Sequence, residues 1–139
     1  MKRKVNAIWK GDGNDGNGIL STQSGAISNM PYSFTTRFKN DDGKLGTNPE
    51  ELIAAALSGC FNMKLAFVLN ENGYYPDELV TDAELTFIDG QITLIQMGLN
   101  GKVPNLKQST FEEFADDAKN NCPISGVLNC EIKVSAKLI

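Results

Sequence analysis

One long apolar segment, NPEELIAAALSGCFNMKL, constrains the fold of this chain more than any other part of the sequence. Asn48 is a favourable helix N-cap, Pro49 suits the first helical position, and Glu51 completes an Asn-x-x-Glu capping box. Apolar residues then continue to a stop at Gly73, so the segment predicts a long core helix. Cys60 lies near its middle, and the segment alone leaves open whether this cysteine is inert packing or a reactive thiol.

The rest of the chain predicts strands and a second helix. STFEEFADDAKNN predicts a helix with a capping box of Ser109 and Glu112, and the IDG sequence is a hairpin signal. GDGNDGNG lacks the Gly-Lys-Ser/Thr ending of a phosphate loop. An EF-hand loop starting at Asp12 would need glycine at its sixth position and glutamate at its twelfth, where the sequence has Asn17 and Gln23. The segment therefore predicts a hairpin tip. Strands are predicted at residues 5–9, 19–22, 25–28, 31–38, 80–87, 91–99 and 131–138. This order predicts an α+β fold with antiparallel sheets.

Composition limits the classes of function. A chain of 139 residues predicts a single domain, residues 1–139. Its net charge of −4 argues against partners such as nucleic acid and anionic membranes, which attract basic surfaces. The basic start at residues 2–4 has no apolar region after it, and we find no run of about 20 apolar residues to span a bilayer. We therefore expect a cytoplasmic protein that does not enter membranes.

The chain has three cysteines and no histidine. The absence of histidine excludes Cys-His and Ser-His-Asp chemistry, and the cysteine spacing is a poor match to a metal site. Cys122 precedes Pro123, which predicts an N-cap position where a helix dipole would favour the thiolate, although simple packing is the alternative. A mid-helix Cys60 needs a cation instead, and Arg37, on the predicted strand 31–38, is the strongest candidate.

Three segments together resemble one known family. PYSFTTRF, then GTNPEELIAAALSGCFNM, then NCPISGVL is similar to the OsmC branch of the OsmC/Ohr family of thiol peroxidases, and the resemblance runs essentially end to end. It implies an OsmC-like fold around the cysteine-bearing helix. It also implies that Cys60 is the peroxidatic cysteine, that Cys122 resolves its sulfenic acid to a disulfide, and that Glu50 holds Arg37 beside the thiolate. Cys130 matches no motif of the family and is predicted to be passive.

The resemblance further implies partners rather than a bound cofactor. A peroxide is the expected substrate, and a dithiol, on a dihydrolipoyl group or a lipoylated protein, is the expected reductant. Glu50 and Cys60 are ten residues apart, which is roughly 15 Å along a straight helix, so one arginine could hardly serve both. The family's intertwined homodimer would resolve this, with Arg37 and Glu50 supplied by the other subunit. The alternative is a non-catalytic OsmC-fold protein that binds a ligand or acts in stress.

Overall fold

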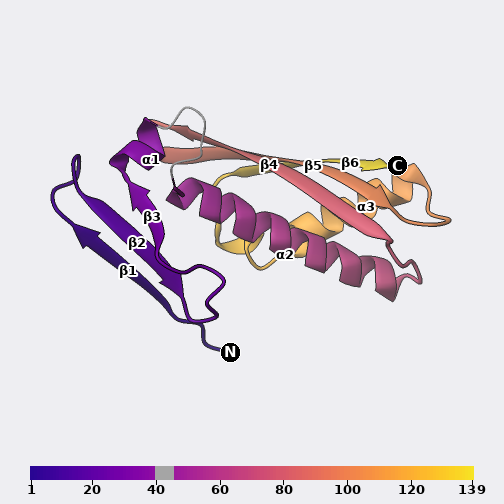
Figure 1. Cartoon of the computed structure of the whole chain (residues 1–139). Helices are drawn as coiled ribbons and strands as arrows, with labels where there is room; N and C mark the ends of the chain where they lie inside the picture. Colours follow the sequence, from indigo (N-terminus) through magenta and orange to yellow (C-terminus); the bar gives the residue numbers. More distant parts are fainter. Residues whose placement is uncertain (40–45) are drawn as a thin grey trace. The chain divides into compact units, whose positions relative to one another are not determined.

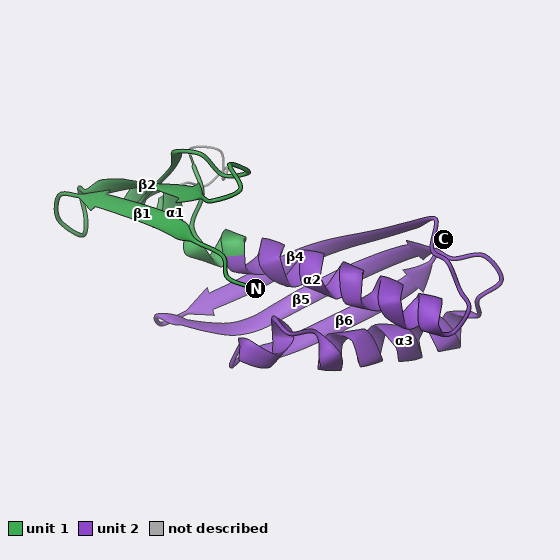
Figure 2. Cartoon of the chain, turned by 90° about the horizontal axis from the view of Figure 1, so that it is seen from below, with its two compact units in different colours: residues 1–52 green, residues 53–139 purple. Residues whose placement is uncertain are grey.

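A computed structural model describes residues 1–39 and 46–139 of the chain. Figure 1 follows the elements along the sequence, and Figure 2 colours two compact units, residues 1–52 (unit 1) and 53–139 (unit 2). The sequence KNDDGKLGT, which precedes the long helix and whose polar composition predicts a loop, falls mostly outside the described residues. The α+β fold class is confirmed, because each unit has a three-stranded sheet and the chain carries three α-helices among its described residues. That the two units form one domain stays a prediction.

Unit 1 contains an antiparallel sheet of β1 (Val5–Lys10), β2 (Asn17–Thr22) and β3 (Met30–Ser33), in that order. The predicted hairpin tip between β1 and β2 is confirmed, with the Asp12 carboxylate accepting two backbone N–H groups at 2.8 Å. The predicted strand at residues 25–28 is wrong. These residues belong to a turn after β2, since Gly25 has a left-handed φ of 77° that a strand does not accommodate.

The predicted strand 31–38 is wrong in its second half. β3 ends at Ser33, and the short helix α1 (Phe34–Phe38) follows at once. The physical reason is a capping box, in which the Ser33 hydroxyl accepts the Thr36 N–H at 3.0 Å and the Ser33 N–H donates to Thr36 Oγ1 at 2.8 Å. Arg37 therefore lies on a helix rather than on a strand.

The long helix is confirmed as α2 (Pro49–Glu71). Asn48 Oδ1 accepts the Glu51 N–H at 2.8 Å, as predicted for the N-cap. The Glu51 carboxylate differs from the predicted box, because it accepts a hydrogen bond from Thr47 Oγ1 at 2.7 Å. Gly73 follows the helix with a φ of 82°, which is the left-handed conformation expected just beyond a helix C-terminus.

α2 is also long and apolar enough to cross a membrane by length and composition, so the expectation that no such segment exists is wrong. The same test is passed by core helices of water-soluble proteins. In unit 2, one side of α2 supplies buried side chains to the protein core, namely Leu57, Phe61, Leu65, Val68 and Leu69. The length and apolarity of α2 are therefore also those of a core helix.

Unit 2 is built on a sheet of β4 (Glu78–Ile88), β5 (Gln91–Lys102) and β6 (Glu131–Leu138), with β5 in the middle. The predicted hairpin between β4 and β5 is confirmed, and Asp89 and Gly90 both adopt positive φ. The antiparallel prediction fails for one pair, because β6 runs parallel to β5. The chain between them contains the helix α3 (Gln108–Asn121), which serves as the crossover that a parallel pair requires.

Figure 2 shows α2 and α3 against the same face of the β4–β5–β6 sheet. The core of unit 2 lies in this layer, where α2 residues meet Phe111 of α3 and alternate residues of β5 such as Ile95 and Leu99. The absence of a side chain at Gly101 lets the Phe111 ring of α3 pack directly against β5, since a Cβ at this position would lie 2.4 Å from that ring. The predicted Ser109 cap of α3 is wrong, because the N-cap is Lys107, two residues earlier in the chain.

Candidate active site

The predicted site residues fall into two groups, one in each unit. Unit 2 holds Cys60 and Cys122, which are 62 residues apart in the sequence. Unit 1 holds Arg37 and Glu50. Each group is brought together by the fold of its own unit.

The two thiols in unit 2 come from different elements. Cys60 lies in the middle of α2 and is partly buried, whereas Cys122 follows the last residue of α3 and is only 2 % exposed. They are close enough that a hydrogen bond between them shifts the pKa of both. Both are free thiols in this structure. The packing of α2 and α3 on one sheet face therefore places these two cysteines side by side.

The two thiols differ in acidity. Burial raises the pKa of Cys60, and the hydrogen bond with Cys122 raises it further. Burial acts to raise the pKa of Cys122 as well. Hydrogen bonds from Cys60 and from the backbone of Ser125 and Ile124, together with the nearby Ser125 hydroxyl, outweigh this effect. The net result is a lowered pKa. A raised pKa disfavours the Cys60 thiolate, so a cation beside Cys60 would be needed to stabilise it near neutral pH.

The predicted N-cap position of Cys122 is wrong. Cys122 is the C-cap of α3, and the 3₁₀ helix η1 (Ser125–Val127) begins three residues later with Ile124 as its N-cap. A helix of three residues has no appreciable dipole. The predicted lowering of the pKa of Cys122 is nevertheless present, and its cause is a set of individual donors in the turn that follows Pro123.

In unit 1 the fold pairs Arg37 of α1 with Glu50 in the first turn of α2. Arg37 Nε donates to both carboxylate oxygens of Glu50, at 3.0 and 3.2 Å, and Nη2 donates to Oε1. The side chain of Glu50 is 14 % exposed and that of Arg37 is 34 % exposed. Nearby, buried Thr36 Oγ1 donates to the Thr47 carbonyl at 3.0 Å, which links α1 to the residues before α2. The arginine is thus held in a fixed, two-pronged geometry.

Arg37 lines a pocket of about 140 Å³ that lies within unit 1. Its wall is largely aromatic, with Trp9, Tyr32, Phe34 and Phe38 among the lining residues. The rings of Trp9 and Tyr32 pack 5.4 Å apart. The pocket therefore combines a cation with an apolar lining.

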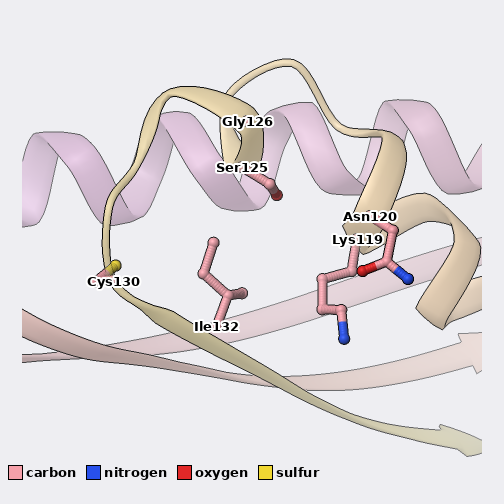
Figure 3. Close-up of a pocket in the computed structure, with 6 residues that line it drawn as sticks. All are labelled: Lys119, Asn120, Ser125, Gly126, Cys130 and Ile132. Atoms are coloured by element: carbon pink, nitrogen blue, oxygen red, sulfur yellow. The ribbon is translucent and has the colours of Figure 1, made fainter.

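Cys130 lines a pocket of about 280 Å³, together with Ser125 of the turn that follows Cys122 (Figure 3). Figure 3 shows Cys130 at one end of this pocket, with Ile132 on its floor and Lys119 and Asn120 at the other end. Burial raises the pKa of the Cys130 thiol, with no hydrogen bond to offset it. Its environment therefore favours the neutral thiol, in keeping with the passive role predicted for it.

Among residues 1–39 and 46–139, no three His, Cys, Asp or Glu side chains lie together in a way that could hold a metal ion.

One functional candidate was missed by the sequence reasoning. Ser125 belongs to the Cys-Pro-Ile-Ser motif, yet only its cysteine was considered there. A hydroxyl three residues after a cysteine, across a proline turn, is the signal that could have identified it.

Comparison with known proteins identifies the family. The profile of the family described as OsmC-like protein matches residues 40–137. "Peroxiredoxin OsmC" of Escherichia coli is 39 % identical over 99 % of this chain and 97 % of its own length. "Organic hydroperoxide resistance protein-like 1" of Staphylococcus saprophyticus is 31 % identical over 67 % of this chain and 69 % of its own length.

Solved structures give the same result for the fold. The organic hydroperoxide resistance protein OhrB of Bacillus subtilis aligns with a TM-score of 0.70 at 25 % identity, over 99 % of this chain and 98 % of the other. An OsmC-like protein of Mycoplasma pneumoniae aligns with a TM-score of 0.75 at 14 % identity, over 100 % and 98 % of the two chains, and shows likeness of fold alone. This chain belongs to the OsmC-like protein family, as the sequence motifs predicted.

Proposed function

We propose that this protein is a two-cysteine thiol peroxidase in defence against oxidative stress. The observation that supports it best is the pairing of Cys60 with Cys122, a partly exposed thiol beside a buried one. The Cys60 thiolate attacks a peroxide ROOH, which gives the sulfenic acid and the alcohol ROH. The Cys122 thiol then condenses with the sulfenic acid, releasing water and forming the Cys60–Cys122 disulfide. The names of the relatives, peroxiredoxin and organic hydroperoxide resistance protein, support the same reaction.

Arg37 is the proposed activator of Cys60. Burial and the hydrogen bond with Cys122 raise the pKa of Cys60, so a cation is needed to stabilise its thiolate. A guanidinium stays charged at every working pH and presents several donors, so it can bind thiolate and peroxide oxygen at once. Glu50 fixes its orientation through the paired hydrogen bonds in unit 1. In this proposal Arg37 and Glu50 come from a second copy of the chain.

Homodimer formation is supported by unit 1. Among the described residues, every buried apolar side chain belongs to unit 2, while β1 exposes Val5, Ile8 and Trp9. A segment of about 50 residues without a core is unlike an independently stable structure. In unit 2, Met63 and Phe67 also leave an apolar stripe on α2 exposed. A second copy that covers these surfaces would both stabilise unit 1 and bring in an arginine.

The proposed substrates are organic hydroperoxides, hydrogen peroxide or both. The aromatic pocket beside Arg37 supports organic hydroperoxides, because it offers apolar surface next to the donor for the peroxide oxygen. The proposed reductant is an external dithiol, such as a dihydrolipoyl group, and no bound cofactor is needed. The proposed location is the cytoplasm, where reducing systems keep cysteines as thiols.

Steady-state kinetics with dihydrolipoamide and either cumene hydroperoxide or hydrogen peroxide tests this function. Cys60→Ser should abolish turnover, and Cys122→Ser should give a single burst of sulfenic acid. Cys130→Ser is the matched control and should retain activity, because Cys130 is not among the groups that act on the Cys60 or Cys122 thiol. Full turnover by Cys60→Ser would refute the proposal, and inactivity of the wild-type chain with every peroxide and dithiol would favour a non-catalytic ligand-binding protein.

A further inference from the structure

The hydroxyl of Ser125 is buried without a hydrogen-bond partner. Its Oγ is inaccessible to solvent and makes no hydrogen bond to any described residue. Figure 3 shows the side chain directed inward from the η1 turn. Buried polar groups of folded proteins are nearly always paired, so an unpaired one calls for a specific explanation.

The position of Ser125 suggests which group pairs with it. The turn from Cys122 to Ser125 is closed by a hydrogen bond from the Gly126 N–H to the Cys122 carbonyl at 3.1 Å. This places the hydroxyl near the Cys122 sulfur, where it acts to lower the pKa of that thiol. A neutral thiol is a weak acceptor, whereas a thiolate is a strong one. The hydroxyl therefore gains its hydrogen bond when Cys122 carries the negative charge.

A donor that is satisfied only in the charged state stabilises that state selectively. The backbone N–H groups of Ile124 and Ser125 act on Cys122 in the same direction. Three donors from one short turn therefore surround a buried sulfur that is only 2 % exposed. These donors would stabilise a thiolate that forms on Cys122 when a disulfide breaks. The burial of the sulfur disfavours direct attack on it by an external thiol.

We propose that Ser125 is a positioning residue that makes Cys122 the leaving thiolate when the Cys60–Cys122 disulfide is reduced. This inference rests on the proposed function. The thiolate of an external dithiol attacks Cys60 Sγ, a bond forms between these two sulfurs, and the Cys60–Cys122 bond breaks. Its electron pair stays on Cys122 Sγ, where the Ser125 hydroxyl donates to it. The second thiol of the reductant, as thiolate, then displaces Cys60 and leaves as a cyclic disulfide.

Access and acidity both favour this direction of attack. Cys60 is partly exposed and Cys122 is buried, so an external thiol reaches Cys60 more readily. In thiol–disulfide exchange the thiol with the lower pKa leaves faster. The structure gives Cys122 that property through the turn donors and Ser125. The mixed disulfide with the reductant therefore forms on Cys60.

The test uses the whole 139-residue chain with Cys130→Ser, so that only the two cysteines of the proposed pair remain. The disulfide is formed with diamide, which makes the measurement independent of peroxide turnover. A monothiol, 2-mercaptoethanol, is added, the reaction is quenched with acid, and peptide mass spectrometry locates the adduct. Reduction rates are compared for Ser125→Ala, Ser125→Thr and the control Ser135→Ala on the exposed side of β6.

We expect the adduct on Cys60, and we expect Ser125→Ala to slow reduction by about three- to tenfold because one hydrogen bond to a developing charge is lost. Ser125→Thr keeps the hydroxyl and should restore most of the rate. In a Cys60→Ser background, thiolate absorbance should show a higher pKa for Cys122 when Ser125→Ala is added.

An adduct on Cys122 would overturn the inference, as would equal reduction rates for Ser125→Ala and the unsubstituted protein. The adduct position in the unsubstituted protein decides the matter even if Ser125→Ala does not fold. Failure of diamide to link Cys60 and Cys122 would overturn the proposed function itself, which distinguishes the two results.

Discussion

The two units of this chain differ in how they are packed and in which candidate site residues they hold. Unit 2 has a continuous apolar core between two helices and one sheet face, and it places Cys60 and Cys122 together. Unit 1 has no buried apolar side chain among its described residues, yet it holds Arg37 and Glu50 in a two-pronged ion pair. One unit thus carries the thiols and a core, and the other carries the cation without a core. This difference is what the proposed dimer would explain, since a second copy would provide apolar contacts to unit 1.

The largest expected effect concerns the core of unit 2. Phe111→Ala empties a fully buried position in contact with Gly101, and we expect it to lower the free energy of unfolding by about 3–5 kcal/mol. Phe38→Ala removes the same side chain from a half-exposed position in unit 1 and should cost about 1 kcal/mol or less. Guanidinium denaturation measures both. Equal losses would show that unit 1 has a core of its own.

A smaller effect concerns association. Val5 on β1 is 76 % exposed in the single chain, so Val5→Ser should leave the fold of the chain intact. If β1 is covered by a second copy, the loss of each Val5 side chain should weaken the dimer by on the order of 1 kcal/mol. A symmetric dimer contains two such side chains, so the total effect is twice as large. Sedimentation equilibrium measures the dissociation constant. Ser135→Ala on β6 is the control, and an unchanged constant for Val5→Ser would exclude β1 from the interface.

The smallest effect is on the pH dependence of unit 1. Hydrogen bonds from the backbone of Asp15 and Asn14 lower the pKa of Asp12, so the charged carboxylate stabilises the hairpin tip. The contribution is present above the unfolded pKa and is lost as pH falls through the lower folded pKa. Asp12→Asn should therefore lower the melting temperature slightly at neutral pH and not at all in strong acid. A difference that grows on acidification would contradict this assignment.

Much of the fold could be predicted because its signals are local. Asn48 and Pro49 define the start of α2, and Asp89–Gly90 defines the β4–β5 hairpin. The helix α1 was missed because PYSFTTRF alternates like a strand, and the Ser33–Thr36 capping box that overrides this pattern uses threonine in place of the usual glutamate. The parallel β5–β6 pair was missed although a helix between two strands is its usual signal.

The site was predictable in part. Motifs resembling a known family pointed to four residues, and the fold brings them together as two pairs, Arg37 with Glu50 and Cys60 with Cys122. The acidity of Cys122 was predicted in direction but with the wrong cause, because a helix dipole was expected where separate donors act. The sequence could have marked Ser125 as a candidate through its place after the Cys-Pro turn, but only the structure shows that its hydroxyl is buried without a partner.

The most direct test of the account is whether the cation and the thiol of one active site come from different copies. Arg37→Ala and Cys60→Ser are each expected to be inactive alone. Coexpressed, about half of the dimers should be mixed, with one of two sites intact, so about a quarter of the wild-type peroxidase activity should return. Persistent inactivity of the mixed dimers, with their formation verified by two different affinity tags, would contradict the central claim that a second copy completes the site.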